Sequence, residues 1–343
     1  MSVYDSERNY EFTQALESVS EPLGKLAHAS DGIYKSTVEE HKLASRQAES
    51  DKPVIESANQ VSRFSVEWAG SFIPEALWKQ HATLHKGDKI ALHAARKPKM
   101  ERRLVAGLTS DDLYFSNRFI LVKLTQNEYA AHYILALLNS SALNKYFKIR
   151  FPITDVDGYM LHQLPIRRIT FATPDPNRSG LLSKGKQLYE KAFIHRDFVT
   201  LLNFVDDQLS AKPERADVIH DLLAFLAGRM MELNKEKETA AKKFLTDLKD
   251  FQDIDVHALK PKTKLDEFWK LETTGLFAHF HANKLHLKAP DEEKIRDRFQ
   301  KSKEQLIPLV TQIRFTDELI DQIVYRLYHL TPAEIKIVES AAK

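Results

Sequence analysis

The chain has no cysteine among its 343 residues. This absence excludes disulfide bonds, thiolate chemistry and zinc sites with cysteine ligands. No run of about eighteen apolar residues occurs, so the sequence predicts no membrane-spanning helix. The amino terminus, MSVYDSERNYEFTQALESV, has no basic segment followed by an apolar one, and we therefore expect no export signal. These absences together favour a cytoplasmic protein.

The formal net charge is only +2, but the charges are unevenly distributed. Residues 85–170 contain 14 Lys or Arg and 7 Asp or Glu, a local balance of +7, which leaves −5 for the rest of the chain. A cationic region joined to a mildly acidic one is typical of proteins that bind polyanions. A solvated, lysine-rich surface is the alternative explanation.

The pattern of apolar residues changes near residue 175. Before it, short runs rich in β-branched and aromatic residues predict strands. Residues 171–180, FATPDPNRSG, contain turn residues and are the expected boundary. We therefore predict an α+β protein with a mixed, β-rich domain at residues 1–175 and a mainly α-helical domain at residues 176–343. The predicted strands are Ser65–Trp68, Lys89–His93, Leu104–Ala106, Leu113–Phe115, Phe119–Leu124 and Leu164–Phe171.

Apolar residues recur at three- and four-residue steps after this boundary, as in amphipathic helices. The segment Arg215–Phe251 predicts one long helix, typical of an antiparallel hairpin or coiled-coil arm. Thr331 and Glu334 predict a capping box, with Pro332 at the first helical position. The other predicted helical blocks are Ser183–Leu209 and Asp291–Ile313, and the latter leads through Thr316-Asp317 into Leu319–Leu330.

Three sequence blocks carry a resemblance to a known family. They are KIALHAARKPKMERRLVAGLTSDDLYFSNRFILVKL (89–124), YILALLNSSALNKYF (133–147) and FPITDVDGYMLHQLPI (151–166). In this order they resemble the target-recognition domain of adenine-methylating restriction–modification enzymes, namely the TaqI-like specificity family and the C-terminal part of type IIG enzymes. HDLLAFLAGRMMELNKEK (220–237) and FTDELIDQIVYRLYHLTPAEIKIVE (315–339) resemble the same C-terminal regions, so the resemblance covers residues 20–340.

The catalytic motifs of such enzymes are missing. There is no Asn/Asp-Pro-Pro-Tyr/Phe tetrapeptide to hold a flipped adenine, and the ten glycines are scattered. Glu334-Ile335-Lys336 has the letters of a nuclease motif but falls in a predicted helix. The resemblance therefore implies a non-catalytic specificity subunit that directs a partner adenine-N6 methyltransferase, or a methyltransferase–nuclease subunit, in a restriction or phage-defence system. S-adenosylmethionine is expected on that partner, with no cofactor on this chain, and the helical arms are expected to bind the partner or a second copy.

Cationic and amide side chains on loops of the basic half are the expected contacts with double-stranded DNA. Arginine pairs well with guanine and asparagine with adenine, while phosphate contacts give affinity and position. The densest group has five cations within eight residues, 96–103. The candidates for base or phosphate contact are Arg63, His93, Arg96, Lys97, Lys99, Arg102, Arg103, Asn117 and Arg118, and those expected to contact phosphates are Lys148, Arg150, Arg167 and Arg168.

Other clusters are explained more simply by structure. Asp155-Val156-Asp157-Gly158 begins like a calcium loop but lacks the later ligands, so we expect a turn, or an Asp that accepts from a cytosine amino group. His279, His281 and His286 have no supporting carboxylate, and we expect no metal site. The aromatic residues near them are expected in a helical core. Two rival functions stay open: a non-catalytic helical scaffold that binds a protein, and an enzyme with unfamiliar motifs.

Overall fold

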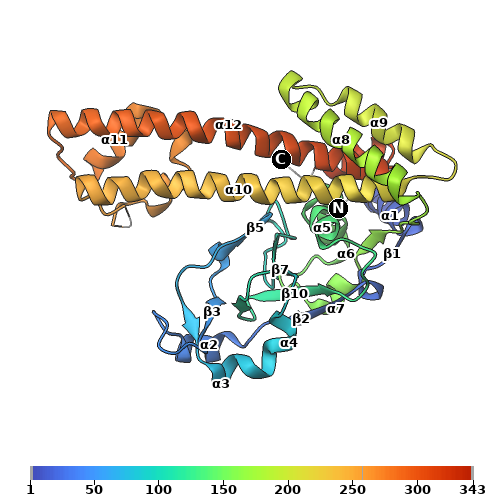
Figure 1. The fold of residues 1–343 in the computed structure, drawn as a ribbon, viewed down its shortest axis with the longest axis horizontal. Helices are drawn as coiled ribbons and strands as arrows, with labels where there is room; N and C mark the ends of the chain where they lie inside the picture. The colour runs from blue at the N-terminus through green and yellow to red at the C-terminus, as the bar shows by residue number, and fades with distance from the viewer. Residues whose placement is uncertain (1–2, 257, 341–343) are drawn as a thin grey trace. The chain divides into compact units, whose positions relative to one another are not determined.

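The computed structural model describes residues 3–256 and 258–340 and has the predicted α+β fold, with a β-rich region followed by helices (Figure 1). It forms two compact units, each described here by itself. Unit 1 consists of Met1–Arg229 and Asp317–Lys343, and unit 2 of Met230–Thr316. The boundary expected at residue 175 lies inside unit 1. The division into a DNA-reading and a helical domain therefore stays a prediction.

Unit 1 contains a four-stranded antiparallel sheet with the order β2-β10-β7-β8. The strands β7 (Lys89–His93) and β10 (Phe119–Leu124) begin and end at the predicted residues. The remaining strands are β1 (Ser20–Pro22), β2 (Ala27–Asp31), β3 (Lys52–Ile55), β4 (Val61–Ser62), β5 (Ser65–Val66), β6 (Phe72–Ile73), β8 (Ala106–Thr109), β9 (Tyr114–Phe115) and β11 (Pro165–Arg167).

Close packing against β8 explains why one residue of this strand, Gly107, is a glycine. A Cβ atom on Gly107 would lie 2.4 Å from the carbonyl oxygen of Ser65, so only glycine fits there without a shift of the backbone. The smaller sheets have the orders β6-β3-β9, β4-β5 and β1-β11. In the first of these, β3 and β9 are parallel.

Helix α5 (Ala131–Asn139) packs on the edge strand β8, and α6 (Ser141–Arg150) follows it after one residue. Every residue of α5 from Tyr133 to Asn139 is buried, in keeping with its almost wholly apolar sequence. Unit 1 also contains, among the described residues, α1 (Val3–Ser18), η1 (Leu23–Lys25), α2 (Lys35–His41), η2 (Ala58–Gln60), α3 (Glu75–Trp78), η3 (Lys79–His81), α4 (Ala82–His85), α7 (Gly158–His162), α8 (Asp175–His195), α9 (Val199–Leu209) and α13 (Pro332–Glu339).

Two helix boundaries differ from the prediction. The segment expected to be one helix at 183–209 is α8 and α9, because Arg196 has φ 55° and ends α8 in the left-handed conformation. The blocks expected at 291–313 and 319–330 form one helix, α12 (Ala289–Leu327), which runs through Thr316-Asp317. There the Thr316 hydroxyl donates to the carbonyl of Gln312, within the helix, and does not cap a new one.

The long helix α10 (Ala216–Gln252) and the capping box of α13 are confirmed. Glu334 and Lys336 lie on α13, which agrees with the structural explanation of Glu-Ile-Lys. No helix in the described part of the chain is both long enough and apolar enough to span a bilayer.

Unit 2 has a core of its own. Phe244 and Leu248 of α10 pack with Phe299 of α12 and with Phe280 of α11 (Thr273–Ala282). Phe268, Phe277 and Phe280 are core residues, as predicted, and η4 (Lys262–Leu265) and η5 (Phe268–Lys270) complete the unit. Among the described residues no group of three His, Asp or Glu is placed to hold a metal ion.

Candidate nucleic-acid interface

The loops that carry most of the candidate cations meet at one end of the four-stranded sheet. Because the strands are antiparallel, β2 and β7 end where β10 and β8 begin. Residues 32–34, 94–105 and 116–118 are therefore neighbours. The amide of Ala94 donates to the carbonyl of Arg118 (2.8 Å), and the amide of Asn117 donates to the carbonyl of Ile33 (2.6 Å).

A fourth segment, 152–156, lies beside the 94–105 loop. The amide of Arg96 donates to the carbonyl of Thr154 (3.0 Å), and the amide of Val156 donates to that of Ala94 (2.8 Å). The predicted turn at Asp155 is thus held against the cationic loop. We call the four segments 32–34, 94–105, 116–118 and 152–156 the loop end of the sheet.

Exposed cations at the loop end are Lys97, Lys99 and Arg118. Within the described chain, the side chains of Lys97 and Lys99 have no hydrogen bond or ion pair, and Arg118 is 3.9 Å from Glu39. Tyr34, which the sequence analysis did not single out, is 73% exposed, and its neighbour Ile33 bonds the 116–118 loop. Exposed cations and an exposed aromatic ring at one end of a sheet suit contact with phosphates and bases.

Three candidate residues are buried and bonded inside unit 1. The guanidinium of Arg103 donates to the carbonyl of Phe151 (3.0 Å) and lies over the ring of Phe147 at 5.1 Å. His93 bonds the carbonyl of Val61 (2.8 Å), and burial lowers its pKa. Arg167 pairs with Glu214 at 2.9 Å. A phosphate cannot reach these atoms in this structure, and we leave the three residues out of the proposed interface.

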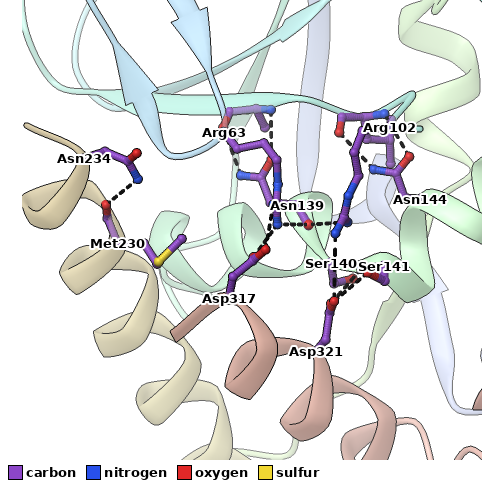
Figure 2. A network of polar contacts seen from close by, with 12 residues as sticks. Arg63, Arg102, Asn139, Ser140, Ser141, Asn144, Met230, Asn234, Asp317 and Asp321 are labelled. Atoms are coloured by element: carbon purple, nitrogen blue, oxygen red, sulfur yellow. Dashed lines mark hydrogen bonds and ion pairs between the residues drawn. The ribbon is translucent and has the colours of Figure 1, made fainter. Parts of the chain in front are cut away.

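Arg63 and Arg102 connect the β-rich part of unit 1 to the C-terminal part of α12. Both donate to the carbonyl oxygen of Asn139, at 2.8 and 3.0 Å, as Figure 2 shows. Arg63 also donates to Asp317 (2.8 Å), and Arg102 lies 3.9 Å from Asp321. Burial raises the pKa of Asp321, Arg102 opposes this shift, and Asp317 reinforces it. These two arginines therefore mainly stabilise the packing of α12 against the β-rich part of unit 1.

The remaining candidates have mixed positions. The Nε of Arg96 donates to the carbonyl of Arg102 (2.7 Å), and the Asn117 Oδ1 accepts the amide of Lys35 (2.8 Å). Arg150 is 4.0 Å from Glu17, and Arg168 donates to the carbonyl of Ser20 (2.8 Å). Lys148 lies on α6, beside Lys145, which the sequence analysis also missed.

Two buried amides explain the LNSSALN block of α5 and α6. Asn139 accepts from the amide of Ala106 (3.1 Å) and donates to its carbonyl (2.9 Å), as a neighbouring strand would. Asn144 does the same for Leu104, at 3.4 and 2.9 Å. These bonds satisfy backbone amides and carbonyls at the free edge of β8 and in the residues just before it. The five-residue spacing of two asparagines in an apolar helical block was the available signal.

Two segments match family models. Residues 52–166 match the TaqI-like C-terminal specificity domain, and residues 217–324 match a domain of unknown function (DUF8810). The first match confirms the resemblance drawn from the sequence, and its segment contains three of the four parts of the loop end. No curated protein matches the chain.

Proposed function

We propose that this chain is a sequence-specific, double-stranded DNA recognition subunit of a restriction–modification system. One observation supports the proposal above all. The segment that matches a specificity domain also contains the loops that bring exposed cations together at one end of a sheet. The cations give affinity for the phosphate backbone, and the loop tips read base edges.

Recognition would divide between the exposed residues of the loop end. Lys97 and Lys99 are flexible point charges without internal partners among the described residues, which suits phosphate contacts. Arg118 presents a planar fork of donors that matches the O6 and N7 of guanine. Tyr34 offers a ring for apolar contact with a base. Interactions of this kind fix both register and sequence.

Catalysis would come from a partner chain. We propose that an adenine-N6 methyltransferase, alone or joined to a nuclease, binds S-adenosylmethionine and acts on the flipped base at the site this chain selects. The chain itself would be non-catalytic and would act in the cytoplasm, where cellular and phage DNA are present. The amphipathic helices α10 and α12 would bind the partner or a second copy of the chain.

The test is binding of a randomised duplex pool at 50 and 200 mM salt, with sequencing of the bound fraction. We expect an enriched motif of a few base pairs and a steep loss of affinity at the higher salt concentration. Tight binding without a motif would indicate a general DNA-binding protein or a reader that needs its partner. No binding at 50 mM would reject the proposal and favour a protein-binding scaffold.

The double variant Lys97→Gln/Lys99→Gln tests the loop end directly. Because two phosphate contacts are removed, the slope of log K against log salt should become less steep by about 1.8. The enriched motif should stay the same, since phosphate contacts carry no sequence information. The control is Lys243→Gln/Lys301→Gln, which removes the same charge from exposed positions of unit 2. An equal effect of both variants would refute a local interface.

A further inference from the structure

A small pocket lies between the end of the 94–105 loop and helix α6. Arg102 and Glu101 line it from the loop, and Ser141, Asn144, Lys145 and Lys148 line it from α6. Its volume is about 30 Å³, room for about two water-sized groups. A base or a nucleotide does not fit into this volume, but one or two oxygen atoms of a larger anion do.

The geometry of α6 places Lys145 and Lys148 side by side. Residues three positions apart lie on the same face of a helix, where like charges repel each other. Both lysines line the same pocket, together with Arg102 of the loop. Such a like-charged arrangement is unfavourable unless an anion is bound between the cations.

The lining supplies one carboxylate, Glu101, against three cations. In the described part of the chain, the side chains of Lys145 and Lys148 have no hydrogen bond or ion pair. Burial lowers the pKa of Lys148, Lys145 lowers it further, and Glu101 opposes this effect. Arg102 is 3.9 Å from Asp321, but that carboxylate also accepts the amide of Ser141 (2.7 Å).

The uncharged polar groups of the pocket are already occupied. The Asn144 amide bonds the backbone of Arg103 and Leu104, and the Ser141 hydroxyl donates to Asp321. Arg102 donates to the carbonyl of Asn139 (3.0 Å), so the donors that are left for a ligand are the ammonium groups of Lys145 and Lys148. These two groups, with the charge of Arg102 beside them, match the non-bridging oxygens of a phosphodiester, which carries a full negative charge.

We propose that Arg102, Lys145 and Lys148 form a phosphate-binding pocket that holds one backbone phosphodiester of the bound DNA. This inference rests on the proposed function and extends the interface from the loop end to α6. The same loop joins the two sites, since Lys97 and Lys99 precede Arg102 by only a few residues. A phosphate held on α6 would fix the register of the duplex against the base-reading loops.

Two measurements on the double variant Lys145→Gln/Lys148→Gln test the pocket. In the first, the slope of log K against log salt for duplex DNA should become less steep by about 0.9 to 1.8, the value for one or two lost cation contacts. In the second, inorganic phosphate is added at constant ionic strength without DNA. It should raise the melting temperature of the unaltered protein more than that of the variant. Lys243→Gln/Lys301→Gln is again the control in both measurements.

The two measurements separate this inference from the proposed function. If the unaltered protein binds DNA and the α6 variant behaves like the control in both, the pocket is not a phosphate site. If the protein does not bind DNA but phosphate stabilises it and not the α6 variant, the pocket binds free phosphate, and the DNA source is refuted. Circular dichroism of each variant shows that the fold is intact.

Discussion

The imidazole of His85 is fully buried in the β-rich part of unit 1. It bonds the carbonyl of His81 at 3.0 Å and stacks on the ring of Tyr114 at 4.6 Å. Burial lowers its pKa from 6.5 to about 4. The folded protein therefore keeps His85 neutral over a range of pH in which the unfolded chain binds a proton.

This residue makes stability depend on pH in a defined direction. Because the folded pKa is the lower one, the unfolded state binds more protons between pH 6.5 and 4, and stability falls as the pH falls through that range. Between pH 7 and pH 4.5 the free energy of unfolding should fall by about 2 kcal/mol from this group. Urea unfolding at pH 7 and pH 4.5, for the protein and for His85→Gln, measures it.

His85→Gln should lose less stability than the unaltered protein over the same change of pH. The comparison uses the difference between the two pH values, since the substitution also changes packing. His195→Gln, at an exposed position, is the control and should keep the full pH dependence. An unchanged pH dependence in His85→Gln would show that other groups cause it.

The edge strand β8 depends on side chains of α5 and α6 for its hydrogen bonds. Asn139→Ala would leave the buried amide of Ala106 without the Asn139 acceptor, while the Ala106 carbonyl keeps its bond from the amide of Phe64 (2.8 Å). One unsatisfied buried group costs about 1–3 kcal/mol, so the free energy of unfolding should fall by about that amount. The midpoint of urea unfolding measures this loss.

Asn203→Ala on α9 serves as the matched control, because Asn203 is exposed on a helix. It should change the free energy of unfolding by less than about 0.5 kcal/mol. A small effect of Asn139→Ala, equal to that of the control, would mean that water replaces the amide at the edge of β8. The LNSSALN block would then need another explanation.

The ion pair between Arg63 and Asp317 joins residues that are 254 positions apart. Both side chains are about a quarter exposed, so the pair is largely removed from water. Asp317→Ala should lower the free energy of unfolding by about 2–3 kcal/mol, because it leaves the guanidinium desolvated with only the Asn139 carbonyl. Thermal or urea unfolding gives this value.

A double-mutant cycle completes that experiment. Arg63→Leu/Asp317→Ala should be more stable than the sum of the two single changes predicts, by about 1–2 kcal/mol, because no charge is then left unpaired. Glu318→Ala, the neighbouring carboxylate on α12, is the control for charge. If the two changes in the free energy of unfolding are strictly additive, the ion pair has no coupling free energy and does not stabilise the fold.

Local patterns predicted much of this fold. Strands β7 and β10 each contain a run of three or more apolar residues, and α13 has its capping residues within four positions. The roles of the arginines were not predictable in the same way. Arg63, Arg103 and Arg167 have the same composition signal as surface cations, but these partners are 47–254 residues away in the sequence, and no local pattern predicts such pairs.

The candidate site was also predictable only in part. The loop cations Lys97 and Lys99 are exposed where the turn residues and charge density predicted them. Lys145 was missed because its neighbours on α6 look like an ordinary amphipathic helix, and only the folded chain brings it to Arg102. The sequence alone did not show that 291–313 and 319–330 form a single helix. Threonine caps helices and also occurs inside them, so Thr316 did not decide between the two.

Unit 1 is assembled from two stretches of chain that are separated by the whole of unit 2. During synthesis the ribosome makes Arg63 first and Asp317 254 residues later. At about 5–20 residues per second, the wait is on the order of ten seconds or more. In that interval Arg167 also lacks Tyr328, whose hydroxyl accepts its amide at 3.0 Å. Unit 1 therefore completes these contacts only after the whole of unit 2 has been synthesised.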